Sequence, residues 1–232
     1  MISAPPEPSV AAQPAASASW RRVHRDILAC VRCVDSGHLA TALPIFQGRP
    51  GQRLMLVGQA PGIVEQGPRK PFAGRSGREL ERWMQRAGFR DDAHFRSLTY
   101  VTSITKCFPG RTSAGSGDRR PSAVEVRNCA SWLDLQLELQ RPTLIILAGT
   151  LAIERFLPGR PLDEVVGRMF DADGGEAATA GGGAPPLLVP LPHPSGASRW
   201  LNDQAHRELL ARSLELLGRA WPVLAAAGDP HR

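Results

Sequence analysis

The alternation of strand-like and helical segments is the feature that most constrains the fold of this chain. Parallel strands need a long crossover connection, usually a helix, so the alternation predicts a mainly parallel sheet with helices on both faces. We therefore expect an α/β fold. The expected strands are Arg53–Val57, Leu98–Thr105, Thr143–Leu147 and Leu187–Leu191.

The helices are predicted from apolar residues at helical spacing and from capping signals. Ser76 with Glu79 and Ser122 with Glu125 both have the spacing of a capping box, and Gly88 is placed to end the first of these helices. The expected helices are Trp20–Val31, Ser76–Ala87, Ser122 to about Leu139, Thr150–Phe156 and Asp203–Leu217.

The length of 232 residues, 42% of them apolar, is enough for a single domain with its own core. Residues 1–18 are rich in Pro, Ala and Ser, which is typical of a disordered tail and not of a signal peptide. We expect one domain over residues 19–225, flexible loops at about 109–120 and 171–186, and a C-terminal tail at 226–232. No apolar run is long enough to span a membrane, so we expect a cytoplasmic protein with reduced thiols.

The net charge of +6 permits an anionic partner such as nucleic acid but does not require one. Lys70 and Lys106 are the only lysines, so arginine supplies nearly all the positive charge. Such a bias can also follow from the base composition of the coding DNA. The charge alone therefore leaves the nature of the partner open.

Four cysteines form the pattern Cys30-x-x-Cys33, Cys107 and Cys129. The first two are close enough in sequence for both sulfurs to reach one metal centre, and four thiolates complete a shell around zinc or an iron–sulfur cluster. Disulfides are the alternative. A chain of this size without a secretion signal favours a shared metal centre, and the spacing does not decide between zinc and iron–sulfur.

Ligands in parallel α/β folds bind beyond the carboxyl ends of the strands. The loop after the first strand is neither a Walker A loop nor a GxGxxG motif, so no nucleotide cofactor is expected. Phe72 can form a flat wall for a planar ligand or can simply be a core residue. His193, held between two prolines, can donate a hydrogen bond to developing negative charge. The expected ligand-facing segments are Gly58–Gly62, Ser103–Cys107, Gly149–Thr150 and Pro192–Ser198.

Together, GQAPG with downstream PFAGRSG, TSITKC, the four cysteines and HPSGASR resemble the uracil-DNA glycosylase superfamily, most closely its iron–sulfur branch (family 4). The resemblance covers about Cys30 to Asn202. It implies a three-layer α/β/α sandwich around a mainly parallel sheet. The implied activity is hydrolysis of the N-glycosidic bond of uracil in DNA, which starts base-excision repair. The expected protein is a monomer that acts on a base flipped out of single- or double-stranded DNA.

The resemblance also implies site roles. Phe72 stacks on the extruded base, and His193 donates a hydrogen bond to uracil O2, where negative charge collects. The loop after the first strand holds the base or the attacking water, and the last loop fills the vacated space and grips the DNA backbone. The cysteines hold a structural [4Fe–4S] cluster. The implied loop residues are Gly58, Gln59, Ala60, Pro61 and Gly62 for the first loop, and Ser195, Gly196, Ser198 and Arg199 for the last.

Two positions depart from the family pattern. Gln59 stands where the family usually has Glu, and a glutamine can orient water but cannot take its proton. Ser103 stands where the family has Asn, and a hydroxyl cannot make the paired contact of an amide with uracil. Two alternatives therefore remain: a glycosylase for another base such as hypoxanthine or xanthine, and a catalytically silent, metal-containing module that binds DNA.

Overall fold

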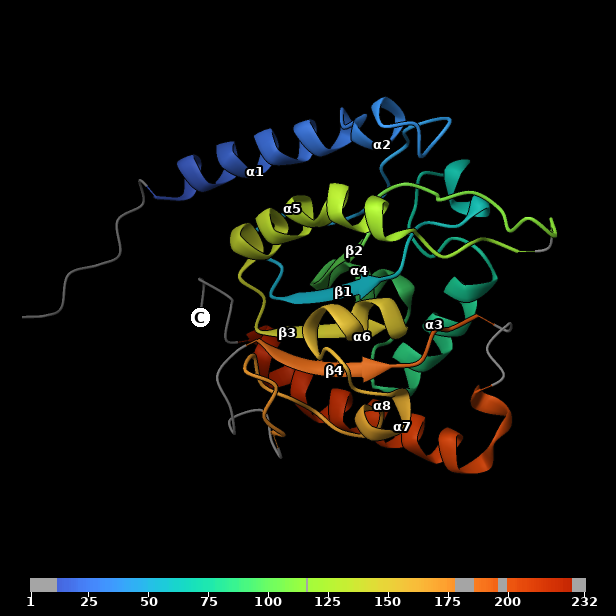
Figure 1. Ribbon diagram of the computed structural model, residues 1–232. Helices are drawn as coiled ribbons and strands as arrows, with labels where there is room; N and C mark the ends of the chain where they lie inside the picture. Colours follow the sequence, from blue (N-terminus) through green and yellow to red (C-terminus); the bar gives the residue numbers. More distant parts are fainter. Residues whose placement is uncertain (1–11, 116, 178–185, 196–199, 227–232) are drawn as a thin grey trace, which may run out of the picture.

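A sheet of four parallel strands in the order β2-β1-β3-β4 forms the centre of the molecule (Figure 1). The computed structural model describes residues 12–115, 117–177, 186–195 and 200–226. Pro190, which cannot donate a ladder hydrogen bond, lies in β4 at one edge of the sheet. The four predicted strands are confirmed, with bounds of β1 Leu54–Gly58, β2 Thr99–Ser103, β3 Leu144–Ala148 and β4 Leu187–Leu191.

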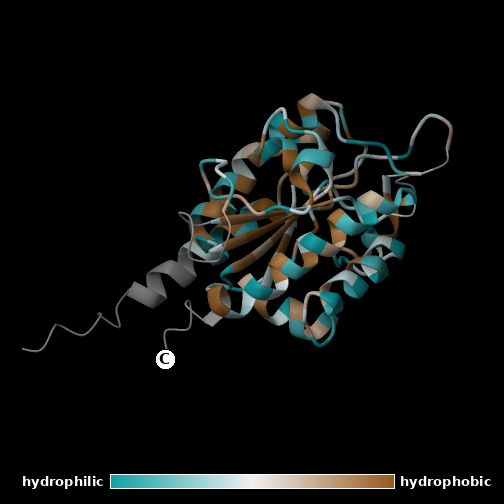
Figure 2. Cartoon of the chain, turned by 90° about the horizontal axis from the view of Figure 1, so that it is seen from below, coloured by the Kyte–Doolittle hydropathy of each residue, from teal (hydrophilic) through white to brown (hydrophobic). Residues whose placement is uncertain are grey.

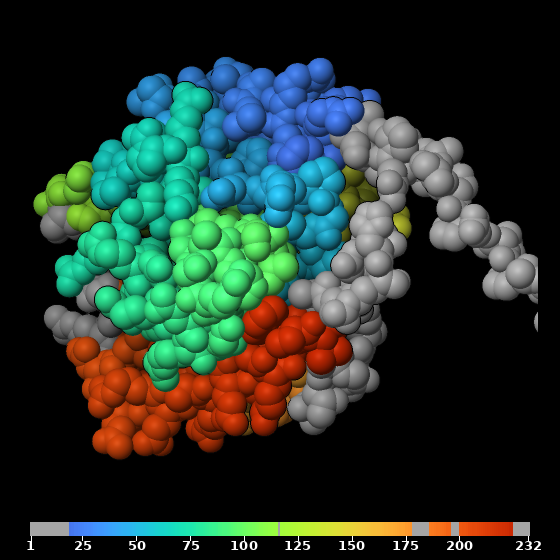
Figure 3. Space-filling model, turned by 180° about the vertical axis from the view of Figure 1, so that it is seen from behind, coloured from blue at the N-terminus to red at the C-terminus, as the bar shows by residue number. Residues whose placement is uncertain are grey.

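Helices cover both faces of the sheet and make three layers, as predicted. One face carries α3 Arg75–Arg86, α4 Asp92–Leu98 and α8 Gln204–Ala226, and Figure 3 shows them as one continuous surface. The other face carries α5 Ala123–Gln140, α6 Thr150–Phe156 and α7 Leu162–Val165. Helices α1 Ala12–Leu28 and α2 Arg32–Asp35 pack against α5, and the short 3-10 helices are η1 Ile63–Gln66 and η2 Trp200–Asn202.

Both faces of the sheet are buried, and β1, β3 and β4 are apolar for this reason, whereas β2 also contains buried Thr99, Thr102 and Ser103. Leu56 and Ile146 face the layer of α3 and α8, where Trp83 is also buried, while Val57 and Ile145 face the opposite layer. Figure 2 shows these apolar strands between helices whose outer faces are hydrophilic. Burial of each large apolar side chain contributes about 1.5–3 kcal/mol, so the two interfaces supply most of the stabilisation.

The N-terminal prediction was only partly correct. Helix α1 begins at Ala12 and not at Trp20, so residues 12–18 of the predicted disordered tail are helical. Alanine is the strongest helix former, and Pro14 lies in the first turn, where proline is tolerated. The helix ends at Leu28, before Cys30. Residues 1–11 and 227–232 lie outside the described ranges.

Of the two predicted capping boxes, one is present at the start of α5 and the other is absent from the start of α3. The box of Ser122 and Glu125 is present, as predicted. The predicted cap at Ser76 was wrong: α3 begins at Arg75 after Gly74, and the Glu79 carboxylate instead accepts a hydrogen bond from Trp83 Nε1 at 2.7 Å. That carboxylate was already engaged by a buried indole one turn away and was not free to cap the helix.

Helices α4 and α7 were missed because each is short, and α8 continues beyond the predicted Leu217 with Pro222 inside it. Asp91 was the available signal for α4, since its side chain accepts from His94 N at 2.7 Å. In the described residues, no helix combines the length and apolar character that a membrane crossing requires.

The turn before α3 depends on a close approach at Gly77. A Cβ at this position would lie 1.7 Å from the Phe72 carbonyl oxygen, so only glycine allows the helix to pack against this turn. Phe72 itself has φ of 55°, a left-handed conformation that non-glycine residues rarely adopt. The position of the Phe72 ring is therefore fixed by its backbone surroundings.

We predict that Gly77→Ala lowers the free energy of unfolding by roughly 1–3 kcal/mol, because the turn must shift to admit the methyl group. Urea denaturation measures this change. Gly67→Ala is the matched control: its φ is −62° and no atom lies within 4 Å of the added Cβ. That variant should be unchanged or slightly more stable. Equal stability of the two variants would contradict the close approach.

Candidate active-site edge and cysteine pocket

The carboxyl ends of the four strands meet at one edge of the sheet, and hydrogen bonds continue to join the chain beyond them. Ile104 N donates to Gly58 O at 2.9 Å, which joins the exits of β1 and β2. Gly149 N donates to Leu191 O at 2.9 Å, which joins the exits of β3 and β4. Because β1 and β3 are neighbours, the two joined pairs form one continuous edge.

The Phe72 ring lies against the end of β1. A Cβ at Gly58 would be 3.0 Å from Phe72 Cζ, so the glycine makes room for the ring. The ring is half-buried and packs partly on the core. Both predicted interpretations of Phe72 are therefore compatible with its position: part of it belongs to the core, and the rest is placed at the ligand-binding edge.

His193 lies against the end of β3, the strand next to β1. A Cβ at Gly149 would be 3.1 Å from His193 Cδ2, and Gly149 has φ of 95°, which also favours glycine. Burial lowers the pKa of His193 below its ordinary value. The imidazole is therefore neutral near pH 7, and it shares the edge with Phe72.

Glu65 in η1 was not among the predicted site residues, yet it joins two segments that were. Its buried carboxylate accepts hydrogen bonds from the backbone N–H groups of Gly62, Phe72 and Ala73. Burial raises the pKa of Glu65 above its usual range, and these N–H donors oppose that rise. A lone acidic residue between two Gly/Pro-rich loops was the only sequence signal for it.

The remaining predicted residues of the first loop, together with Ser103 of β2, lie at the same edge. Gln59 follows β1 and is half-buried, and its carbonyl accepts from Thr105 N at 3.2 Å. Ser103 ends β2, where its buried hydroxyl donates to Thr105 O at 2.7 Å. The other members of this loop are Ala60, Pro61 and Gly62, of which Pro61 is buried.

The loop after β4 is only partly described. Ser195 is half-buried and follows His193 at the same edge. Gly196, Ser198 and Arg199, the other residues predicted to contact DNA, lie outside the described residues.

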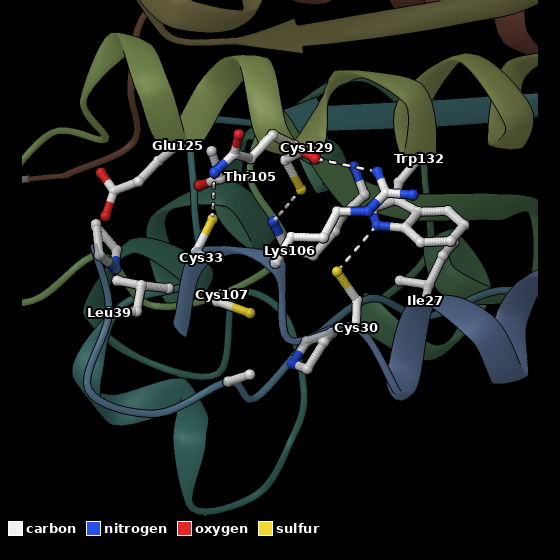
Figure 4. A pocket seen from close by; sticks show the side chains of 15 residues that line it. Ile27, Cys30, Cys33, Leu39, Thr105, Lys106, Cys107, Glu125, Cys129 and Trp132 are labelled. Atoms are coloured by element: carbon white, nitrogen blue, oxygen red, sulfur yellow. Dashed lines mark hydrogen bonds between the residues drawn. The ribbon is translucent and has the colours of Figure 1, made fainter. Parts of the chain in front are cut away.

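The four cysteines line one pocket and come from four separate segments. Cys30 follows α1, Cys33 lies in α2, Cys107 lies in the loop after β2, and Cys129 lies in α5. Figure 4 shows the four side chains around a common space. Ile27 forms part of the apolar wall of this pocket.

Each of the four sulfur atoms accepts a hydrogen bond from an N–H group. Trp132 Nε1 lies 3.1 Å from Cys30 Sγ, Asn128 Nδ2 lies 3.8 Å from Cys33 Sγ, and Lys106 N lies 3.3 Å from Cys129 Sγ (Figure 4). The backbone of Leu43 donates to Cys107. Donors of this kind stabilise thiolates and metal-bound sulfur. In the sequence, Asn128 and Trp132 were recognisable only by their position beside Cys129.

Burial of the pocket disfavours isolated charges. It raises the pKa of Cys107 to about 12, and it also raises the pKa values of Cys33 and Cys129. Burial lowers the pKa of Lys106 to about 8, and the Lys106 ammonium donates to the Ser103 carbonyl. Four thiols with N–H donors and a buried cation form a donor set that fits an anionic metal–thiolate centre.

The cysteines surround the pocket without converging on one point. Within the described ranges, no three His, Cys, Asp or Glu side chains stand close enough together to hold a single metal ion. The pocket thus brings all four predicted metal ligands to its wall, but in the described residues no three of them share one ion position.

A sequence model of the uracil DNA glycosylase superfamily matches residues 45–218. A type-4 uracil-DNA glycosylase of Thermotoga maritima is 27% identical over 172 residues, which are 73% of this chain and 79% of the relative. One from Archaeoglobus fulgidus is 31% identical over 130 residues, or 56% and 59% of the two chains. A type-5 uracil-DNA glycosylase of Pyrobaculum aerophilum is 41% identical over 63 residues, 27% of this chain and 25% of that protein.

The matched region contains the whole sheet, the edge with Phe72 and His193, and two of the four cysteines. Cys30 and Cys33 precede it, in the segment that packs on α5. Because this match covers most of the domain, the chain belongs to the uracil DNA glycosylase superfamily.

Proposed function

We propose that this protein is a monofunctional uracil-DNA glycosylase of the type-4 branch, which hydrolyses the N-glycosidic bond of uracil in DNA. The observation that carries the proposal is the common location of Phe72 and His193. Each ring lies against a glycine at the end of one of two neighbouring strands. That arrangement suits a flat base held by one ring and polarised by the other.

The chemistry follows from these positions. A base inside the duplex cannot be reached, so the nucleotide must be flipped into the edge, at a cost of a few kcal/mol. Phe72 stacks on the extruded ring. As the glycosidic bond breaks, its electrons move onto the base, and the neutral imidazole of His193 donates a hydrogen bond to O2. Gln59 orients the water that adds to the sugar carbon, and the proton that this water loses neutralises the departing base anion.

Glu65 is a positioning residue in this proposal. Its carboxylate holds the N–H groups of Gly62 and Phe72 together, and it thereby fixes the first loop relative to the stacking ring. Productive alignment of a bound base depends on such positioning, because displacements of about 1 Å can lower rates by a hundredfold. Glu65 itself does not touch the reacting atoms.

The four cysteines are proposed to bind a [4Fe–4S] cluster. In a zinc site each sulfur lies about 2.3 Å from a single ion, whereas a four-iron cluster fills the space between more widely separated thiolates. The pocket fits the second case better, because no three ligands meet at one ion position in the described residues. Hydrolysis involves no net oxidation or reduction, so the cluster would supply only a structural crosslink.

DNA is the proposed partner, either single- or double-stranded, and the protein is expected to act as a monomer in the compartment that holds the DNA. No nucleotide cofactor enters this reaction, since water is the only co-reactant of the hydrolysis.

We predict that His193→Ala lowers the rate of uracil release by a hundred- to a thousandfold, because it removes a preorganised donor to the leaving anion. The measurement is single-turnover release from single- and double-stranded oligonucleotides, with circular dichroism to verify folding. The control is His38→Ala, which changes an exposed histidine outside the edge. Full activity of the His193 variant would refute the mechanism. Salt-dependent DNA binding by the wild type without base release would favour the silent DNA-binding module.

We predict that the purified protein absorbs near 400 nm and contains iron and sulfide, and that Cys107→Ser loses both. The same variant should have a lower melting temperature, because the bound group no longer ties the N-terminal helices to the loop after β2 and to α5. Elemental analysis and thermal denaturation are the readouts. Zinc in place of iron would show that the cysteines bind zinc and not an iron–sulfur cluster. An unchanged melting temperature would show that the bound group has no structural role.

A second candidate substrate class is favoured by the Ser103 hydroxyl. Its proton is directed to Thr105 O, so it can accept from a ring N–H of the base but has no proton left to donate. Uracil and hypoxanthine both present such a ring N–H. A glycosylase for hypoxanthine or xanthine is therefore the alternative function of the same site.

We predict that Ser103→Asn increases the preference for uracil over hypoxanthine, because an amide restores a donor and an acceptor side by side. Paired base contacts contribute about 1–3 kcal/mol of discrimination, which corresponds to roughly a five- to 150-fold change in the ratio of rates. A panel of lesion-bearing oligonucleotides measures this ratio. An unaltered preference would show that Ser103 does not select the base.

A further inference from the structure

The segment between Cys107 and α5 is a hydrogen-bonded arm and not a loose loop. Its two sides pair at an antiparallel bridge between Arg111 and Asp118, with Arg119 N donating to Gly110 O at 2.9 Å and Thr112 N to Gly117 O at 3.1 Å. Figure 1 shows the arm projecting from the body of the protein at the edge where the strands end. We call residues 110–115 and 117–120 the arm.

Two anchors fix the base of the arm. The Arg119 guanidinium makes a bidentate ion pair with the Glu125 carboxylate. The Glu125 side chain is only 3% exposed, and it also takes part in the capping box of α5. On the other side, the Asp118 carboxylate accepts at 3.2 Å from the N–H group of Ile63, the first residue of η1, which directly follows the first loop of the candidate active site. The arm is thus attached both to α5 and to the loop that is proposed to hold the base.

The anchors leave the outer surface of the arm positively charged. Arg111 and Arg120 are exposed, and neither side chain has an ion-pair or hydrogen-bond partner among the described residues. The nearby carboxylates are already engaged: Asp118 with the Ile63 amide, Glu125 with Arg119, and Glu65 with backbone amides. Exposed Arg69 and Arg75 add to the charge of the adjoining loop.

We propose that the arm is a second DNA-binding element, which grips the phosphate backbone of the strand beside the flipped nucleotide through Arg111 and Arg120. This inference rests on the proposed function, because it assumes that DNA approaches the edge that contains Phe72 and His193. A guanidinium matches phosphate oxygens with two parallel N–H groups. The anchored base of the arm holds the backbone of both residues in place before the DNA arrives, which reduces the backbone entropy lost on binding.

The test compares Arg111→Ala/Arg120→Ala with Arg21→Ala/Arg22→Ala, which removes two exposed arginines from α1. Binding of a uracil-free, single-stranded oligonucleotide is measured by fluorescence anisotropy over a series of salt concentrations. Each lost phosphate contact lowers the slope of log K against log salt by about 0.7 for a single strand. The arm variant should lose about 1.4 from this slope and roughly tenfold in affinity at ~0.1 M salt.

The control variant should change neither quantity by a comparable amount, and Arg111→Lys/Arg120→Lys should retain most of the salt dependence. Thermal denaturation verifies that the variants are folded. Unchanged affinity and slope in the alanine variant would overturn the inference, as would an equal loss in the α1 control, which would indicate general electrostatics.

The same experiment separates this inference from the proposed function. Uracil release by the wild type together with unaltered DNA binding by the arm variant would leave the glycosylase function intact and remove the role of the arm. If the wild type releases no base but the arm variant binds DNA more weakly than the wild type, the result would support DNA binding by the arm and contradict the proposed function.

Discussion

The parallel pairing of β1 with β3 is the constraint on which the candidate site depends. Parallel neighbours end at the same edge, so Gly58 and Gly149 come close together although they are distant in sequence. Each glycine admits one ring, Phe72 or His193, that a side chain would displace. The apolar layers on both faces hold this sheet rigid, and the loops can therefore position chemical groups without contributing to the core themselves.

The cysteine pocket lies where the N-terminal helices α1 and α2 meet α5 and the loop after β2. Helices α1 and α2 pack on the outside of α5, and α1 also reaches the edge strand β2, where His24 Nε2 lies 2.7 Å from Tyr100 Oη. The four proposed sulfur ligands come from both sides of the contact between these helices and α5, so a group bound to them would join the helices to the loop after β2. Arg32 reinforces the junction, since its guanidinium stacks on Trp132 at 4.3 Å and donates to Ser131 Oγ at 2.8 Å.

The strands and most helices could be predicted because their pattern is local and apolar. Ser122 and Glu125 formed the capping box they indicated, whereas Ser76 did not, because Glu79 serves the buried Trp83 indole, a tertiary contact that no sequence window contains. Residues such as Phe72 and His193 were found by motif. Glu65, Trp132 and Asn128 were missed, because their importance lies in which N–H or sulfur they meet, and only the folded chain determines that.

The departures at Gln59 and Ser103 become consistent once the state of His193 is considered. Burial keeps its imidazole neutral near pH 7, so in the proposed mechanism it would contribute a hydrogen bond and not a full positive charge to the leaving base. Such a donor helps most when the glycosidic bond is nearly broken and the base carries its negative charge. At that stage the sugar carbon is strongly electrophilic, so the incoming water needs orientation more than deprotonation. In the proposed mechanism an amide at position 59 meets that need, and base selection then depends on Ser103 at the end of β2.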